Sequence, residues 1–128
     1  VHEKRVEIRW RDVDALGHVN NAVYATYLEE CRDEWLERGL GDDEAAWDFV
    51  VARLEIDFRS ELRLEDDVAV AACGLARLGT SSVTTKETIV AGDKLVAEAE
   101  AVLVARNRER TGSRPLTDTE RASLEQAG

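Results

Sequence analysis

A polar segment near the start of the chain, residues 12–21, carries the side chains that acyl transfer requires. It holds two carboxylates, a glycine, a histidine and two asparagines, directly before a stretch with helical spacing. Unpaired amides at a helix N-terminus can bind the oxygen of a carbonyl under attack. A carboxylate such as Asp14 can attack that carbonyl or activate a water molecule. The segment therefore allows acyl-transfer chemistry, beside the ordinary interpretation that its Asp and Asn residues are helix caps and its glycine a turn residue.

Two other chemistries use the same kinds of residue. Asp12 and Asp14 form a D-x-D pair that could bind a metal ion, but no further ligands follow at useful spacing. Cys31 or Cys73 could pair with a histidine as a nucleophile, yet their positions on a helix stripe and within a strand indicate buried thiols. No glycine-rich phosphate loop and no nucleophile elbow is present. We expect no metal site and no cofactor.

One long helix must present this segment. Its buried side is expected to consist of side chains that recur at helical spacing: Tyr24, Tyr27, Leu28, Cys31 and Trp35. Its solvent side is expected to be charged: Glu29, Glu30, Arg32, Asp33 and Glu37. An asparagine is a suitable N-cap, and Gly39 is expected to end the helix.

Alternation of apolar and polar residues predicts five strands. The first has Val6, Ile8 and Trp10 on its buried side, and the second has Ala52, Leu54, Ile56 and Phe58. Three more are expected at 68–77, 81–91 and 95–106, with a hairpin at Gly92–Asp93. Residues 41–46 are interpreted as an acidic loop, and the capping-box spacing of Thr117 and Glu120 predicts a short helix at about 117–126.

This order indicates a single α+β domain spanning residues 1–128, in which one helix lies against one antiparallel sheet. Alanines in the third and fifth strands would let the helix lie close. Acidic residues outnumber basic ones by 27 to 17, giving a net charge of −10, which argues against nucleic-acid binding. No apolar run is long enough to span a membrane, and the first residues contain no apolar signal segment, so a cytoplasmic location is expected.

The motif at residues 11–24, RDVDALGHVNNAVY, closely resembles the signature of the 4-hydroxybenzoyl-CoA thioesterase-like hotdog family. It is also similar to the D-x-D-x-x-x-H-V-N-N stretch of acyl-ACP thioesterases. The likeness continues through Asp57-Phe58-Arg59, Asp66-Asp67-Val68, the turn at 78–82 and residues 95–99. It covers about residues 5–106 in the same order.

The resemblance implies a hotdog fold, with a long central helix wrapped by a curved five-stranded antiparallel sheet. It also implies a thioesterase that hydrolyses an acyl-CoA or an acyl carrier protein thioester, with no cofactor beyond the CoA of the substrate. Hotdog proteins usually form homodimers by joining two sheets edge to edge, and often homotetramers, with active sites at the protomer interface. The alternatives are a non-catalytic acyl-CoA-binding hotdog protein and a dehydratase, whose proline-containing loop is not matched here because Pro115 is the sole proline.

The resemblance also implies roles for individual residues. Asp14 matches the catalytic carboxylate, as nucleophile or general base, and Asn21 falls where a backbone N–H meets the thioester oxygen. His18 matches a histidine of the acyl-ACP thioesterases, whereas Leu16 replaces their asparagine and Glu61 matches a further acidic residue weakly. Expected substrate-binding residues are Asn20, Ala22, Tyr24, Gly79, Thr80, Ser81 and Ser82. Candidate contacts for the CoA phosphates are Arg59, Arg63, Arg77 and Lys86.

Overall fold

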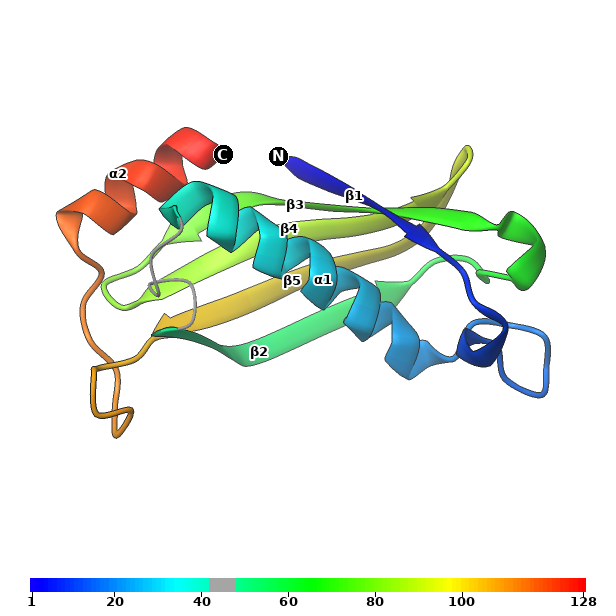
Figure 1. The fold of residues 1–128 in the computed structure, drawn as a ribbon, viewed down its shortest axis with the longest axis horizontal. Helices are drawn as coiled ribbons and strands as arrows, with labels where there is room; N and C mark the ends of the chain where they lie inside the picture. The colour runs from blue at the N-terminus through cyan, green and yellow to red at the C-terminus, as the bar shows by residue number, and fades with distance from the viewer. Residues whose placement is uncertain (42–47) are drawn as a thin grey trace.

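The computed structural model describes residues 1–41 and 48–128 and contains one antiparallel sheet with two helices (Figure 1). The acidic loop expected at 41–46 lies, apart from Gly41, outside these residues. The elements follow one another as β1 (His2–Glu7), η1 (Trp10–Asp12), α1 (Asn21–Leu40), β2 (Phe49–Phe58), η3 (Leu64–Asp66), β3 (Val68–Leu78), β4 (Ser82–Ala91), β5 (Lys94–Ala105) and α2 (Asp118–Ala127).

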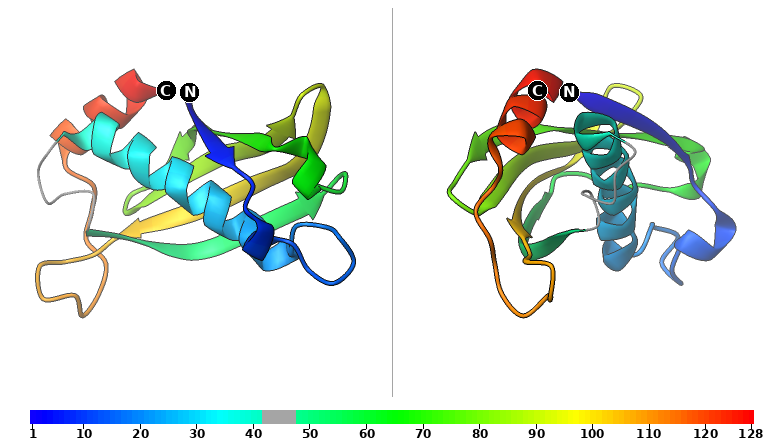
Figure 2. Two further views of the ribbon diagram at one scale, coloured as in Figure 1. Left: turned by 45° about the vertical axis from the view of Figure 1, so that its right-hand side comes forward. Right: turned by 60° about the vertical axis from the view of Figure 1, so that its left-hand side comes forward.

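The five strands lie in the order β1-β3-β4-β5-β2, and each neighbouring pair is antiparallel. β1 and β2 are therefore the two edges of the sheet. The sheet curves around α1, which lies along its concave face (Figure 2). The α+β class and the wrapped-helix arrangement implied by the hotdog resemblance are confirmed.

Helix α1 buries the apolar stripe that its sequence predicts: Tyr24, Tyr27, Leu28, Cys31 and Trp35. The prediction for Arg32 is wrong, because this side chain is buried at 2% exposure. Its guanidinium donates two hydrogen bonds to the buried carboxylate of Glu87 on β4, at 2.8 and 2.9 Å. A charge can enter the core here because a planar carboxylate meets the guanidinium with both oxygens.

The helix also continues past its expected end. Gly39 lies inside α1, which runs to Leu40 and is capped by Gly41. A Cβ at position 39 would lie 3.4 Å from the side chain of Ala127 and 3.5 Å from that of Leu124 in α2. Gly39 is therefore a point of close helix packing rather than a helix stop.

Small residues let the sheet approach α1, as expected. Ala69 and Ala71 of β3, and Ala97 and Ala101 of β5, are fully buried among the core residues. The strand bounds are confirmed to within a few residues, and the hairpin turn at Gly92–Asp93 joins β4 to β5. Ala52, predicted on the buried side of the second strand, is exposed because the register shifts between Val51 and Arg53.

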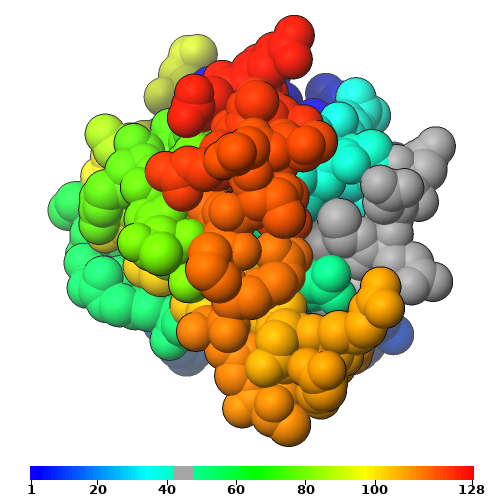
Figure 3. Space-filling view, turned by 90° about the vertical axis from the view of Figure 1, so that its left-hand side faces the viewer, coloured from blue at the N-terminus to red at the C-terminus, as the bar shows by residue number. Residues whose placement is uncertain are grey.

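The predicted first strand extends too far. β1 ends at Glu7, and Trp10 lies in η1 with 82% of its surface exposed, while Val6 and Ile8 are buried as predicted. The C-terminal helix is confirmed as α2, whose capping box joins Thr117 and Glu120. Residues after β5 cover the end of the molecule that faces the viewer in Figure 3. In the described part of the chain, no helix is long and apolar enough to cross a membrane.

Candidate active site

The polar segment before α1 folds into a tight loop. Val13 and Val19 form an isolated antiparallel bridge, and the amide of Asp14 donates to the carbonyl of His18 at 2.8 Å. Between them, the Gly17 amide donates to the Asp14 carbonyl at 3.0 Å. Gly17 has a φ of +83°, which side chains with a Cβ rarely adopt, so the loop requires glycine at this position. The loop is anchored to the rest of the protein by a hydrogen bond of 2.7 Å from the Val19 amide to the Leu62 carbonyl.

The two carboxylates of the D-x-D pair have different surroundings. Asp12 is buried at 6% exposure and accepts hydrogen bonds from the Tyr27 hydroxyl at 2.7 Å and the Arg9 amide at 3.1 Å. Burial works to raise the pKa of Asp12, but these hydrogen bonds and the nearby Arg9 charge hold it below its usual value. Asp12 therefore ties the loop to α1 as a structural anion.

Asp14 is half-buried and points its carboxylate at its own loop. One oxygen, Oδ1, accepts from the amide of Leu16 at 2.9 Å and from that of His18 at 3.4 Å. The other, Oδ2, has no hydrogen-bond partner within residues 1–41 and 48–128. A carboxylate held by one oxygen and free at the other is suited to bind a water molecule or approach an electrophile.

Asp14 lines a cleft of about 490 Å³ at the N-terminal end of α1. The cleft is formed by the loop, the first turn of α1 and the chain that follows β2. Its walls are Asp14, Leu16, His18, Val19, Asn20, Asn21, Tyr24, Phe58, Arg59, Ser60 and Glu61. Of the ten residues expected at the site, five therefore meet in one cleft: Asp14, His18, Asn20, Asn21 and Tyr24.

The first turn of α1 leaves one amide available to a ligand. The side chain of Asn20 caps the helix by accepting from the Ala22 amide at 2.9 Å, and the Asn20 carbonyl accepts from the Val23 amide at 2.8 Å. Ala22 is therefore engaged in capping and does not line the cleft. The Asn21 amide has no acceptor among the described residues, and the helix dipole makes this end favourable for a developing negative charge.

His18 contributes a second titratable side chain to the cleft. Its Nε2 lies 3.3 Å from Oε2 of Glu61, which Arg63 also contacts at 2.8 Å. The hydrogen bond from Arg63, with the charge of His18 as a weaker cause, holds the pKa of Glu61 below its usual value. Glu61 is thus an anion that can orient the imidazole, a position that the sequence indicated weakly.

An aromatic pair forms the apolar wall of the cleft. The Tyr24 hydroxyl accepts from the Leu62 amide at 3.1 Å, and the ring of Phe58 packs on that of Tyr24 with centroids 5.1 Å apart. Sequence reasoning placed Phe58 in the core, and it did not single out Ser60. The sequence offered one signal for both residues, which is their position: Phe58 ends the strand and belongs to the Asp57-Phe58-Arg59 motif, and Ser60 follows that motif directly.

The turn at Gly79–Ser82 is not brought to this cleft within one chain. Gly79 and Thr80 contact the C-terminal segment, where Arg121 donates to the Gly79 carbonyl at 2.8 Å and the Leu116 amide donates to the Thr80 carbonyl at 2.9 Å. The turn joins β3 to β4 at the end of the sheet away from the N-terminus of α1 (Figure 1). A role for these four residues in binding substrate remains a prediction.

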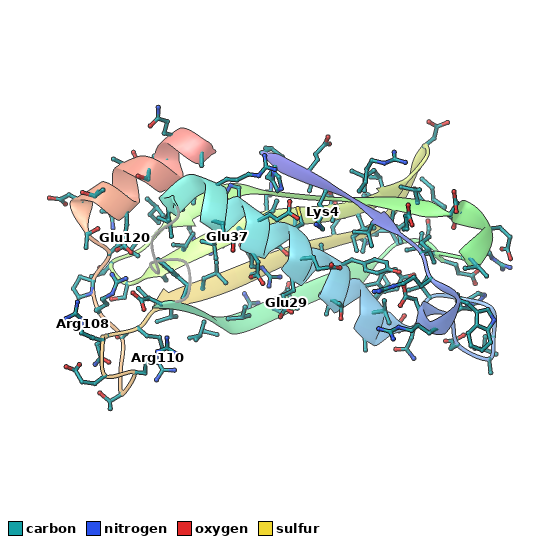
Figure 4. All side chains as sticks on the ribbon, viewed as in Figure 1. Lys4, Glu29, Glu37, Arg108, Arg110 and Glu120 are labelled. Atoms are coloured by element: carbon teal, nitrogen blue, oxygen red, sulfur yellow. The ribbon has the colours of Figure 1, made fainter. Side chains whose placement is uncertain are left out.

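The cations expected near phosphates are dispersed. Arg59 lines the cleft and is paired with Glu98 at 2.9 Å, whereas Arg77 pairs with Glu100 at 3.3 Å outside it. Lys86 lines a separate acidic groove formed by β2, β4 and β5. Arg108 and Arg110, which the sequence did not single out, lie on the loop after β5 at the opposite end of the molecule (Figure 4).

The two cysteines are buried free thiols, as their positions indicated. Burial raises the pKa of Cys31 to about 11 and raises that of Cys73 further, so neither is a thiolate near neutral pH. The cysteine–histidine nucleophile is therefore not supported. The described residues contain no group of three or more Asp, Glu, His or Cys side chains arranged to hold a metal ion.

Comparison with known proteins identifies the family. The family model described as the Thioesterase-like superfamily matches residues 8–124. The acyl-CoA thioester hydrolase YbgC of Escherichia coli is 30% identical over 105 residues, covering 77% of each chain. The acyl-acyl carrier protein thioesterase ATL3 of Arabidopsis thaliana is 39% identical over 75 residues, which cover 56% of this chain and 40% of that relative.

A solved structure is similar over nearly the whole chain. It is a Thermus thermophilus thioesterase, crystallised with coenzyme A and zinc, which superimposes with a TM-score of 0.90 at 32% identity. The match covers 98% of this chain and 92% of that protein. The extent of these matches and the loop-and-helix geometry of the cleft agree, and the chain belongs to the thioesterase-like superfamily.

Proposed function

We propose that this protein hydrolyses an acyl-CoA thioester to a free acid and a thiol in the cleft at the N-terminus of α1. The observation that carries the proposal is the placement of a half-free carboxylate, Asp14, beside a helix N-terminus with an available amide, Asn21. Relatives named for thioester hydrolysis, one of them crystallised with coenzyme A, support CoA as the carrier. The relative that acts on acyl carrier protein makes that carrier the second candidate.

The thioester carbonyl oxygen is placed at the Asn21 amide. As the carbon becomes tetrahedral, negative charge collects on this oxygen, where the N–H and the helix dipole stabilise it. The Asn20 cap keeps the first turn in place but uses the Ala22 amide, so this stabilisation depends on one backbone donor.

Asp14 supplies the attacking oxygen in one of two ways. As a general base, its free Oδ2 takes a proton from water while the water oxygen bonds to the carbonyl carbon. As a nucleophile, Oδ2 bonds to that carbon directly and water then hydrolyses the acyl–aspartyl anhydride. In both cases the carbon–sulfur bond breaks with its electron pair on sulfur, and the thiolate is subsequently protonated. His18, oriented by Glu61, is placed to contact the carbonyl or the leaving sulfur.

The first experiment measures thiol release from a series of acyl-CoAs by wild type and Asp14→Asn. Asparagine can still accept from the Leu16 amide, so the loop is retained while the basic oxygen is lost. We expect turnover to fall by about 10²–10⁴-fold, whereas Asp93→Asn in the β4–β5 turn has wild-type turnover. Wild-type turnover in Asp14→Asn would exclude this residue, and binding without turnover in wild type would favour the non-catalytic alternative.

The backbone amide can be tested separately. Asn21 is the first residue of α1, a position that accepts proline, and Asn20 already has the extended conformation (φ −60°, ψ 138°) that proline requires before it. Asn21→Pro therefore removes the N–H without breaking the helix, while Asn21→Ala keeps it. We expect about 10²–10³-fold loss of kcat in the proline variant alone. Equal activity in the two variants would show that this amide does not bind the thioester oxygen.

We further propose that the protein forms a homodimer joined through β2, and that these dimers associate into a homotetramer. β2 is an edge strand that exposes three apolar side chains: Val50, Val51 and Phe58. An edge of this kind is usually paired or protected. Sedimentation equilibrium of wild type and of Val51→Lys tests the assignment, and a monomer at all concentrations in wild type would contradict it.

A further inference from the structure

The inner face of the sheet beyond the cleft is an alanine-lined track. Residues opposite one another in an antiparallel sheet point to the same face, so Phe58, Ile56 and Leu54 of β2 lie in rows with Ala97, Ala99 and Ala101 of β5. Phe58 faces α1, because its ring packs on Tyr24. These rows are packed: Ala97 and Ala101 are fully buried, Ile56 and Ala99 pack against the core, and none of these residues lines the cleft.

Phe58 separates the cleft from this packed track. It is the last residue of β2, it lines the cleft, and 47% of its surface is exposed, whereas Ile56 and Leu54 behind it are half-buried. Its partner Tyr24 is 3% exposed and anchored by the Leu62 amide, so the tyrosine ring is held in place. Tyr24 lies three residues after Asn21 and on the same side of α1, so the first carbons of an acyl group bound at Asn21 would lie against the ring pair.

The middle row of the track contains a buried charge. The row that begins with Ile56 and Ala99 continues to Glu87 of β4, whose carboxylate is held by Arg32 and by the Thr85 hydroxyl at 2.6 Å. This ion pair is fully enclosed and occupies the space beneath the middle of α1. A methylene chain that reached it would find charged groups rather than apolar ones, and separating the pair would leave buried charges unpaired.

We propose that Phe58 is a specificity-determining residue that restricts the site to compact acyl groups, with a short chain or a single ring. The proposal rests on the proposed thioesterase function and names the substrate class of that site. A flat or short group fits against the Tyr24–Phe58 wall. A long straight chain must displace the Phe58 ring and the side chains packed in the alanine-lined track, and it then meets the Arg32–Glu87 pair.

The test compares kcat/KM for acetyl-, butyryl-, benzoyl-, decanoyl- and palmitoyl-CoA in wild type, Phe58→Ala and Leu95→Ala. Leu95 of β5 is the control, since it is apolar, is 38% exposed, and lies outside both the cleft and the β2 edge. We expect wild type to favour the short or benzoyl substrates, and the decanoyl-to-butyryl ratio to rise about tenfold or more in Phe58→Ala. Leu95→Ala should keep the wild-type ratio.

A wild-type preference for palmitoyl-CoA, or an unchanged ratio in Phe58→Ala, would overturn the inference while leaving the thioesterase function intact. Thermal stabilisation by non-hydrolysable thioether analogues separates the two claims if no substrate is turned over. Stabilisation by the butyryl but not the decanoyl analogue, with decanoyl binding gained in Phe58→Ala, would support the inference although hydrolysis had failed. Equal stabilisation by both analogues in wild type would overturn it.

Discussion

Two carboxylates beside α1 have opposite surroundings. Glu87, under the middle of the helix, is fully buried and uses both oxygens in hydrogen bonds to Arg32 and Thr85. Asp14, in the loop before the helix, is half-buried and leaves one oxygen unpartnered among the described residues. Asp12, two residues away, resembles Glu87 because it is buried and bonded to Tyr27. A carboxylate that is fully paired can hold the fold together, whereas one with a free oxygen facing a cleft can act on a ligand.

The largest loss of stability is expected at the buried pair. Glu87→Gln leaves the Arg32 guanidinium buried without its counter-ion, and we expect the free energy of unfolding to fall by about 3–5 kcal/mol. Urea unfolding measures the change. The double variant Arg32→Met/Glu87→Leu should recover most of the loss, since apolar residues need no partner; a double variant as unstable as Glu87→Gln would contradict this account.

The next largest effect is expected where Asp12 joins the loop to the helix. Tyr27→Phe removes a hydrogen bond to a buried carboxylate, and we expect a loss of about 2 kcal/mol. Chemical denaturation is again the measurement, with Tyr24→Phe as a control that loses a hydrogen bond to a neutral amide. Stability equal to wild type in Tyr27→Phe would show that Asp12 does not need this donor.

Asp12 also makes the loop sensitive to acid. Its pKa is below the usual value in the folded protein, so the folded state releases this proton more readily than the unfolded state. The stabilisation is present above the unfolded pKa of about 4 and is lost as the pH falls through the lower folded value. Urea midpoints between pH 6 and pH 3 should fall more steeply in wild type than in Asp12→Asn, and parallel curves would refute the assignment.

A smaller effect is expected at the helix cap. Asn20→Ala removes the acceptor for the Ala22 amide and should cost about 1 kcal/mol. Thr117→Ala, at the cap of α2, is the matched control for stability and should cost a similar amount without altering turnover. Because Asn20 borders the cleft, its loss should also reduce kcat. An equal kcat in the two variants would show that Asn20 caps the helix without contributing to catalysis.

The smallest change in stability is expected at Asp14, where the catalytic effect is expected to be large. Asp14→Asn keeps the acceptor for the Leu16 amide, and we expect the free energy of unfolding to stay within about 0.5 kcal/mol of wild type. Urea unfolding of the variant used for the turnover assay is the measurement. A loss as large as that of Tyr27→Phe would mean that Asp14, like Asp12, is a structural anion.

The sequence by itself determined the elements and their order. Periodicity located the helix stripe from Tyr24 to Trp35 and the strands, because repeated burial on one face leaves a pattern in the sequence. The capping box at Thr117 and the turn at Gly92–Asp93 were readable for the same local reason. The contiguous loop motif located Asp14, His18, Asn20 and Asn21, which stay together in the fold because they are neighbours in the chain.

Tertiary structure decided what depends on residues distant in sequence. The helical pattern placed Arg32 on the solvent side, but the sheet brings Glu87, which is 55 residues later in the sequence, into contact with its guanidinium. Asp12 and Asp14 are the two equivalent carboxylates of a D-x-D pair in the sequence. They differ in the structure because the Tyr27 hydroxyl donates a hydrogen bond to Asp12 and not to Asp14. Phe58 follows a core pattern, yet the end of β2 leaves its ring in the cleft. These outcomes required the structure because burial and pairing are set by contacts across the chain, which local spacing does not encode.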